Sequence, residues 1–372
     1  MRQTILTATG NYSQLDDYLK KINCKTLFLV CDSAFKFLKI SSYFEALPNK
    51  LEITVVKFDD FQPNPLYESV EKGVKLFNDS KCDAIIAVGG GSSIDVAKCI
   101  KLYSNMNHNE NYLTQIVVSN DIPFLAVPTT AGTGSEATKY AVIYYEGAKQ
   151  SVTHESCIPS TVLFDASALK TLPLYQKKST MLDALCHSVE SFWSVNSTDE
   201  SIKFATYAIR IILENIDGYL SNEDSSNASM LKAANLAGKA INITQTTAGH
   251  AMCYKLTSLY GISHGHAAAL CVNKLWPFML EHVEKCIDPR GKAYLLETFA
   301  NLSHVMDCNN VGEGAEKFSS LLGRLDLTIP KAKCLKDFEE LKTSVNPVRL
   351  KNNPIKLTID DIDVLYHQIL EK

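Results

Sequence analysis

The stretch that decides the fold is DAIIAVGGGSSIDVAK, residues 83–98. It begins with a short apolar run that is typical of a buried β-strand, and a helical pattern follows from Ser92 to Tyr103. The three glycines between them let the backbone approach a pyrophosphate closely, while the helix N-terminus supplies free N–H groups. The spacing is not GxGxxG, and a tight strand–helix turn is the alternative, although such a turn needs only one glycine. We therefore predict a nucleotide-binding turn here.

Short apolar runs alternate with helical patterns on both sides of this stretch. A helical pattern covers residues 66–78. The other predicted strands are residues 26–31, 51–56 and 122–127. Strands that alternate with helices indicate a parallel sheet with helices on both faces.

The pattern changes near residue 171, where strand signals stop and long helical patterns begin. We predict a Rossmann-like α/β dinucleotide-binding domain over residues 1–170 and an all-helical metal-binding catalytic domain over residues 171–372. The active site is expected in the cleft between these two domains, because ligand sites prefer domain interfaces.

Composition narrows the class of protein. The 372 residues are 46% hydrophobic and 21% charged, as in ordinary globular proteins. A net charge of −4 gives no electrostatic footprint for nucleic acid or an anionic membrane, and no apolar run reaches the ~20 residues that span a bilayer. The N-terminus shows no signal-peptide core, and eleven cysteines without a CxxC pair favour reduced thiols. We expect a cytoplasmic protein.

A second informative stretch is MLDALCHSVE, residues 181–190. Asp183 and His187 lie four positions apart, so both side chains leave one face of a helix and offer two metal ligands. Alone, such a pair is more often a surface pair or a buried hydrogen bond. His250 and His264, however, also lie among small and apolar residues, which leave room for an ion and a substrate. The four together would form an N3O shell that suits Fe(II) or Zn(II).

Several features outside the glycine turn indicate which dinucleotide binds. Asp32 directly follows the first predicted strand, where a carboxylate can accept hydrogen bonds from a ribose diol and repel a 2′-phosphate. This favours NAD(H) over NADP(H), with capping of the following helix as the alternative. The loop at residues 128–136 carries hydroxyls and glycines that could line the phosphates and the nicotinamide. Lys149, in a predicted hairpin over residues 140–153, could reach a phosphate.

These motifs together resemble the iron-containing, or group III, alcohol dehydrogenases over nearly the whole chain. The resemblance rests on residues 89–98, 128–136 and 183–187, and on the segments around His250 and His264. It implies the dehydroquinate synthase-like fold of that family, with a Rossmann-like N-terminal domain and a helical C-terminal domain. It also implies an NAD(P)-dependent enzyme that interconverts a small aldehyde and its primary alcohol. Members of the family are often dimers or larger, so a homo-oligomer is expected.

The resemblance also implies roles for individual residues. It assigns a divalent metal, usually Fe(II) and sometimes Zn(II), to Asp183, His187, His250 and His264. It assigns contacts with the dinucleotide to nine positions, namely Asp32, Asn64, Gly90, Gly91, Ser92, Asp95, Thr129, Thr130 and Lys149.

The chain departs from the family pattern at two positions that bear on proton transfer. Many relatives carry a histidine one turn after the third metal ligand, where this chain has Tyr254. Many also have a small or apolar residue after the final His-Gly, where this chain has His266. His266, Tyr254 and a metal-bound water are therefore the alternative proton donors.

The segments 248–258 and 261–266 resemble the branch that includes phosphonoacetaldehyde reductases, which make 2-hydroxyethylphosphonate. Lys255 and His266, with Lys139 as a further candidate, could offset the charge of such a dianion. The alternative for Lys255 is a solvated residue on a helix surface. A different small aldehyde or alcohol is the alternative substrate.

Two other classes of function are alternatives to a dehydrogenase. Sugar-phosphate cyclases such as dehydroquinate synthases are related in architecture and use NAD with a metal, but they coordinate it through one glutamate and two histidines. A metal- or nucleotide-binding protein without activity is the other, and the intact ligand positions and glycine turn argue against it.

Overall fold

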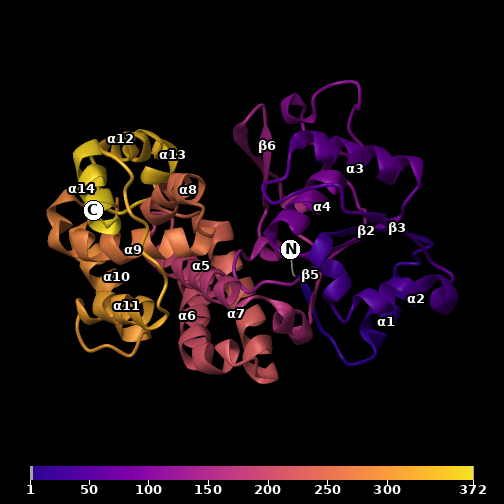
Figure 1. Ribbon diagram of the computed structural model, residues 1–372, viewed down its shortest axis with the longest axis horizontal. Helices are drawn as coiled ribbons and strands as arrows, with labels where there is room; N and C mark the ends of the chain where they lie inside the picture. The colour runs from indigo at the N-terminus through magenta and orange to yellow at the C-terminus, as the bar shows by residue number, and fades with distance from the viewer. Residues whose placement is uncertain (1–2, 372) are drawn as a thin grey trace. The chain divides into compact units, whose positions relative to one another are not determined.

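The computed structural model describes residues 3–371 and divides the chain into two compact units. The first unit runs up to Leu172 and also includes Ser221–Asn235. The second unit contains Pro173–Leu220 and the chain from Leu236 onward. The two units have the architectures predicted for them, a parallel α/β sheet and a set of helices (Figure 1).

A six-stranded parallel sheet forms the centre of the first unit, in the order β1-β8-β5-β4-β2-β3. The strands are β1 (Thr4–Thr7), β2 (Thr26–Cys31), β3 (Thr54–Phe58), β4 (Ala84–Gly89), β5 (Phe124–Pro128) and β8 (Thr161–Phe164). Cys31 is in register with Val88, and Gly89 with Pro128. The loops that follow β2, β4 and β5 therefore emerge side by side at one end of the sheet.

The strands β2, β4 and β5 agree with the predicted strands to within two residues, and one further predicted strand does not. The helices α3 (Tyr67–Asp79) and α4 (Gly91–Tyr103) and the hairpin of β6 (Tyr140–Tyr145) and β7 (Ala148–Thr153) lie where the sequence predicts them. The strand predicted over residues 51–56 is wrong at its start, because the helix α2 (Ser41–Leu51) continues to Leu51. Glu52 then adopts a left-handed φ of 56°, so the strand begins at Thr54.

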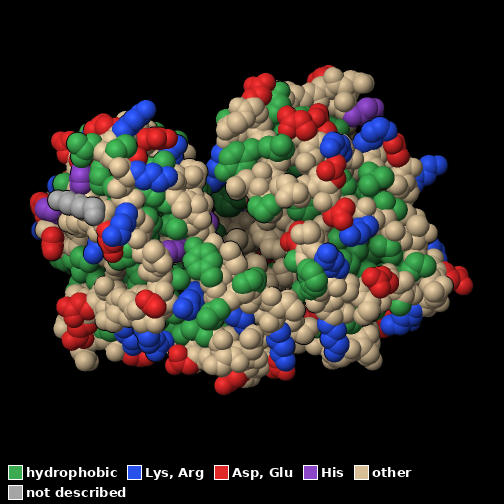
Figure 2. Space-filling model, in the orientation of Figure 1, with side chains coloured by type: hydrophobic (Ala, Val, Ile, Leu, Met, Phe, Trp, Pro, Cys, Tyr) green, Lys and Arg blue, Asp and Glu red, His purple; other side chains and the backbone are tan. Residues whose placement is uncertain are grey.

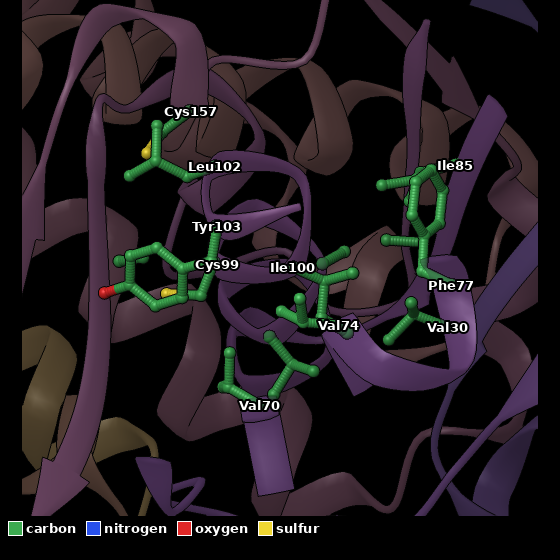
Figure 3. Close-up of a cluster of buried hydrophobic side chains, with 14 of the residues drawn as sticks. Val30, Val70, Val74, Phe77, Ile85, Cys99, Ile100, Leu102, Tyr103 and Cys157 are labelled. Atoms are coloured by element: carbon green, nitrogen blue, oxygen red, sulfur yellow. The ribbon is translucent and has the colours of Figure 1, made fainter. Parts of the chain in front are cut away.

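Both faces of the central strands are buried, as their continuous apolar sequences predict. Along β2, Phe28 and Val30 belong to one hydrophobic cluster, while Leu27 and Leu29 belong to another on the opposite face. Figure 3 shows part of the first cluster, in which side chains of α3 and α4 meet those of β2 and β4. Strand alternation thus gives the sheet a core on each side.

The helix α4 is tied to the hairpin region by buried polar contacts. Nζ of Lys98, which is fully buried, donates to the carbonyl oxygens of Thr138 at 2.8 Å and Tyr140 at 2.6 Å, and to Oγ1 of Thr138 at 3.1 Å. Asp95 accepts from Oγ of Ser135 at 2.5 Å and from the N–H of Val142 at 2.9 Å. Burial lowers the pKa of Lys98, and the nearby Asp95 opposes that shift. These bonds fix the loop after β5 beside the glycine turn.

The second unit is built from helices, and no β-strand follows β8 within residues 3–371. Its helices are α5 (Leu174–Trp193), α6 (Asp199–Leu220), the later part of α7 (Asp224–Thr244), α8 (Ala248–Tyr260), α9 (His264–Glu281), α10 (Lys292–Val305), α11 (Glu313–Arg324), α12 (Leu335–Thr343), α13 (Pro347–Leu350) and α14 (Ile359–Ile369). The helix α5 packs against α6 and α9 and is buried almost all round from Met181 to Trp193.

Two surface properties of the described residues bear on the class of protein. On the face that Figure 2 shows, acidic and basic side chains are interspersed, in keeping with a net charge of −4. None of the helices within residues 3–371 is both long enough and apolar enough to cross a bilayer.

Replacing Lys98 with methionine should destabilise the first unit. The methionine keeps the apolar stem but removes the donor to two buried carbonyl groups, so we expect a loss of about 2–4 kcal/mol in the free energy of unfolding. Urea unfolding followed by circular dichroism measures this loss. Lys75→Met, which breaks only an exposed ion pair with Asp79, is the control and should change stability by less than about 1 kcal/mol. Equal effects of the two substitutions would contradict a structural role for Lys98.

Candidate metal centre and nucleotide turn

The buried helix α5 carries the first two candidate metal ligands. Asp183 and His187 lie one turn apart, and Oδ1 of Asp183 is 3.8 Å from Nε2 of His187. Both side chains are buried. Burial alone would raise the pKa of Asp183, but the neighbouring histidines lower it well below its usual range, so the carboxylate is ionised. Burial lowers the pKa of His187 to about 4, which keeps its imidazole neutral and able to bind a metal.

The helices α8 and α9 bring the other two candidates to the same carboxylate oxygen. Nε2 of His250 lies 3.4 Å from Oδ1 of Asp183, and Nε2 of His264 lies 3.8 Å from it. Four ligands placed about 2.1 Å from a tetrahedral ion would lie about 3.4 Å from one another. The ligand atoms of Asp183, His187 and His250 all lie within 4.8 Å of one another, so these three residues can hold one divalent cation. His264 lies near enough to Asp183 to be a candidate fourth ligand, and the N3O donor set of the four suits iron or zinc.

Access to this cluster is uneven. The side chain of His264 is 36% exposed, whereas those of Asp183, His187 and His250 are 4%, 7% and 1% exposed. Three of the four candidate ligands are therefore buried, and His264 is partly exposed.

Gly265 explains how α9 approaches α5 so closely. A Cβ atom at this position would lie 2.0 Å from the carbonyl oxygen of Ser179 and 2.6 Å from Cβ of Asp183. Real atoms do not approach so closely, so only glycine allows the first turn of α9 to place His264 beside Asp183. In this pair of residues, His264 is the candidate metal ligand, and Gly265 allows the close helix contact that places His264 beside Asp183.

Glu190 is a residue of this centre that the sequence analysis missed. Its carboxylate is fully buried, and Oε2 forms a short hydrogen bond with Nδ1 of His250. Oε1 accepts from Oγ1 of Thr247 at 2.5 Å and from two N–H groups of the first turn of α8. A carboxylate on the far nitrogen fixes the ring so that Nε2 faces the metal. The sequence spacing could have indicated Glu190, because it follows Asp183 by seven residues and so lies on the same face of α5.

The second carboxylate also sets the charge of His250. Burial lowers the pKa of His250, but the negative charges of Glu190 and Asp183 outweigh this effect and raise the pKa to about 9. The ring is therefore protonated at neutral pH before a metal binds, and metal binding must release that proton.

The three catalytic candidates lie in different surroundings. The ring of Tyr254 stacks on that of His264 with centroids 5.3 Å apart, and burial raises the pKa of its phenol. Nδ1 of His266 lies 3.2 Å from the hydroxyl of Tyr175, and burial lowers the pKa of His266 to about 4. Lys255 forms an ion pair with Glu340 on α12, with 2.5 Å between Nζ and Oε1. Of the three, Tyr254 is the one seen to contact a candidate metal ligand.

In the first unit, most of the predicted cofactor residues follow the carboxyl ends of β2, β4 and β5, whereas Asn64 lies in the loop between β3 and α3 and Lys149 lies in β7. Asp32 uses one oxygen to cap the short 3-10 helix that follows β2, accepting from the N–H of Ala34 at 2.9 Å. Its other oxygen lies 3.4 Å from Oγ of Ser93 at the glycine turn. The two roles weighed for Asp32 are thus compatible, because they use different oxygens.

The three glycines have a steric reason to be there. A Cβ atom on Gly89 would lie 2.2 Å from Oγ of Ser93, and one on Gly91 would lie 3.1 Å from Cγ2 of Thr133. None of the three glycines has a positive φ, so they serve close approach rather than a left-handed turn. A tight turn with a single glycine could not bring the loop after β5 this near.

The remaining cofactor candidates differ in the contacts that they make within the protein. The N–H of Thr129 donates to the carbonyl of Gly89 at 3.1 Å, and the side chain of Thr130 lies beside Gly90. Asn64 has a φ of 60° in the exposed loop before α3. Both oxygens of Asp95 are bound within the protein, and the charge of Lys149 is among those that lower its pKa against burial.

Comparison with known proteins bears on both units. The model of the iron-containing alcohol dehydrogenases matches residues 3–166, and that of the C-terminal part of the same family matches residues 177–370. The NAD-dependent methanol dehydrogenase of Bacillus methanolicus is 29% identical over 262 residues, which cover 69% of each chain. The phosphonoacetaldehyde reductase of Streptomyces viridochromogenes is 31% identical over 231 residues, or 58% of each chain.

Among solved structures, the sulfoacetaldehyde reductase of Bifidobacterium kashiwanohense in complex with NAD+ aligns with a TM-score of 0.86 and 23% identity. The alignment covers 100% of this chain and 97% of that one. At this level of identity the likeness shows a shared fold, and it confirms the predicted fold class.

Replacing Glu190 with glutamine should weaken metal binding. The amide keeps the size of the side chain but removes the charge that orients and polarises His250, so we expect the metal affinity to fall about 10–100-fold. Competition with a chelator measures the affinity, and circular dichroism checks that the protein is folded. Glu281→Gln, at the exposed end of α9, is the matched control. An unchanged affinity in folded Glu190→Gln would contradict the role given to this carboxylate.

Proposed function

This chain belongs to the iron-containing alcohol dehydrogenase family of oxidoreductases, and from that premise we propose that it reduces a small aldehyde to its primary alcohol with NADH, or catalyses the reverse reaction. One observation carries the proposal. A single carboxylate oxygen of Asp183 lies 3.4–3.8 Å from three imidazole nitrogens, and all of these side chains except that of His264 are buried.

The proposed metal ligands are Asp183, His187, His250 and His264. An iron or zinc ion bound there supplies Lewis-acid polarisation of a carbonyl oxygen. The residues of the chain do the rest. Glu190 holds His250 in the binding tautomer, and the buried walls exclude water from the reacting centre.

The proposed dinucleotide site is the turn at Gly89–Gly91 with the loops after β2 and β5. A pyrophosphate at the start of α4 would meet free N–H groups and the positive end of the helix dipole. The second oxygen of Asp32, which lies beside this turn, favours a ribose diol over a 2′-phosphate. Relatives whose names include NAD support the same preference for this chain.

For proton delivery we propose Tyr254 ahead of His266. Its ring lies against that of His264, the candidate ligand whose side chain is partly exposed. The phenol of Tyr254 carries a proton at neutral pH. Burial raises its pKa and makes it a weaker acid than an ordinary tyrosine, so its proton would pass only to a strong base such as an alkoxide. His266 is neutral at that pH and faces Tyr175.

The finer proposal for the substrate is phosphonoacetaldehyde, with 2-hydroxyethylphosphonate as the product. The partial match to a phosphonoacetaldehyde reductase supports it. A cytoplasmic location is supported by the eleven cysteines, which form no disulfide within residues 3–371 and are mostly buried. The homodimer expected from the family resemblance stays a prediction.

The reaction can be tested by measuring NADH oxidation with protein loaded with iron or zinc and a panel of charged and neutral aldehydes. We expect metal-dependent turnover with at least one small aldehyde, and net conversion of NADH to NAD+. His264→Ala should lose metal and activity together, because it removes one of four ligands. Retention of metal and full activity by His264→Ala would refute the ligand assignment, whereas turnover without net oxidation of NADH would favour the cyclase alternative.

Replacing Asp32 with glycine tests the dinucleotide site separately. Loss of the carboxylate removes the repulsion of a 2′-phosphate and a partner of the ribose diol, so the ratio of kcat/KM for NADPH to that for NADH should rise about 10-fold or more. Steady-state kinetics with both cofactors measures this ratio. Asp32→Asn serves as the matched variant that keeps the capping geometry without the charge. If neither substitution changes the ratio, Asp32 does not lie at the ribose.

A further inference from the structure

One cation of the second unit has no acidic partner. Arg349, in the short helix α13, is half-buried, and its guanidinium forms no ion pair with any residue from 3 to 371. Within those residues its hydrogen bond is from Nη1 to Oγ1 of Thr246, at 2.6 Å. Most donors of the planar guanidinium are therefore left for a ligand or for water.

The protein holds Arg349 in a fixed position near the metal centre. Nδ2 of Asn352 donates to the carbonyl of Thr246 at 3.1 Å, and the carbonyl of Asn352 accepts from the N–H of Val195 at 3.0 Å. Thr246 directly precedes Thr247, whose N–H and hydroxyl both bind Glu190. The guanidinium is thus bound to the turn that leads into the helix bearing His250.

Electrostatics give a second indication of this proximity. The charge of Arg349 contributes to the lowered pKa of His187 and opposes the burial that raises the pKa of Tyr254. Both side chains belong to the metal centre or contact it, so the guanidinium is near enough to act on them. The carboxylates of Asp183 and Glu190 can balance the charge of a divalent cation, which leaves the charge of Arg349 for a ligand to balance.

We propose that Arg349 binds the anionic group of a small aldehyde whose carbonyl end lies at the metal centre. The inference rests on the proposed function and names the substrate class, namely short aldehydes with a tetrahedral oxyanion such as phosphonate or sulfonate. The planar fork of an arginine matches two oxygens of such a group. Lys255, the cation first considered for this role, is paired with Glu340.

The kinetic test compares phosphonoacetaldehyde with propionaldehyde, a neutral aldehyde of similar length, in metal-loaded wild type, Arg349→Gln and Arg349→Lys. The ratio of kcat/KM for the two substrates should fall at least ~10-fold in Arg349→Gln, as expected for losing a charge-assisted hydrogen bond, and mostly through KM. The ratio for Arg349→Lys should lie between those of wild type and Arg349→Gln, because lysine keeps the positive charge but lacks the planar pair of donors. Arg324→Gln, which removes an exposed arginine paired with Asp217, is the control and should keep the wild-type ratio.

A binding test keeps the inference separate from turnover. Isothermal titration of methylphosphonate and of methanesulfonate into the metal-loaded protein measures recognition of the anion without any reaction. We expect wild type to bind methylphosphonate and Arg349→Gln to bind it at least ~10-fold more weakly, with metal content unchanged. The methanesulfonate arm shows whether a monoanion suffices or a dianion is required.

The outcomes separate the two claims. Anion binding that depends on Arg349 in a protein that reduces no aldehyde would support this site and refute the proposed function. Turnover of neutral aldehydes, with no Arg349-dependent binding of either anion, would overturn this site and leave the proposed function in place. Equal loss of both substrates in Arg349→Gln would also overturn it.

Discussion

The second unit depends on one oxygen atom, Oδ1 of Asp183, around which three imidazole nitrogens lie at 3.4–3.8 Å. A buried carboxylate and three rings aimed at one point are stable together only when charge is balanced. Glu190 contributes to that balance by binding the far nitrogen of His250. The packing of α5, α8 and α9 can be understood as the arrangement that brings these groups together, with Gly265 removing the Cβ atom that would keep two of the helices apart.

The first unit contains the proposed dinucleotide site, which consists largely of backbone groups. Parallel strands in register place Asp32, the glycine turn and Thr129 at one end of the sheet. Lys98 and Asp95 then hold the loop after β5 and the β6–β7 hairpin against α4 from inside the protein. Because Lys98 and Asp95 are bound within the protein, recognition of the proposed dinucleotide would fall to N–H groups, hydroxyls and the carboxylate of Asp32.

Much of this could be predicted from the sequence where a local pattern was strong. The central strands and α4 follow from continuous apolar runs and a glycine-rich boundary, and the four metal-ligand candidates from residue type and a helical spacing. The edge strand β1 was not predicted, because it has only four residues with mostly exposed side chains. The grouping of Ser221–Asn235 with the first unit depends on tertiary contacts that no local pattern reports, such as the bond from Asn235 to Glu136. Arg349 is likewise nearly a hundred residues from His250, and only the fold brings it near.

The fixed backbone at the glycine turn has a thermodynamic consequence. The loops there are ordered by contacts within the protein, so a dinucleotide need not immobilise them when it binds. Because the Asp32 carboxylate is already oriented by the N–H of Ala34, discrimination between ribose and its phosphorylated form would arise from repulsion of the wrong partner more than from new contacts with the right one. Selectivity of that kind can be lost by removing the charge of one residue, without any change in the structure of the surrounding loops.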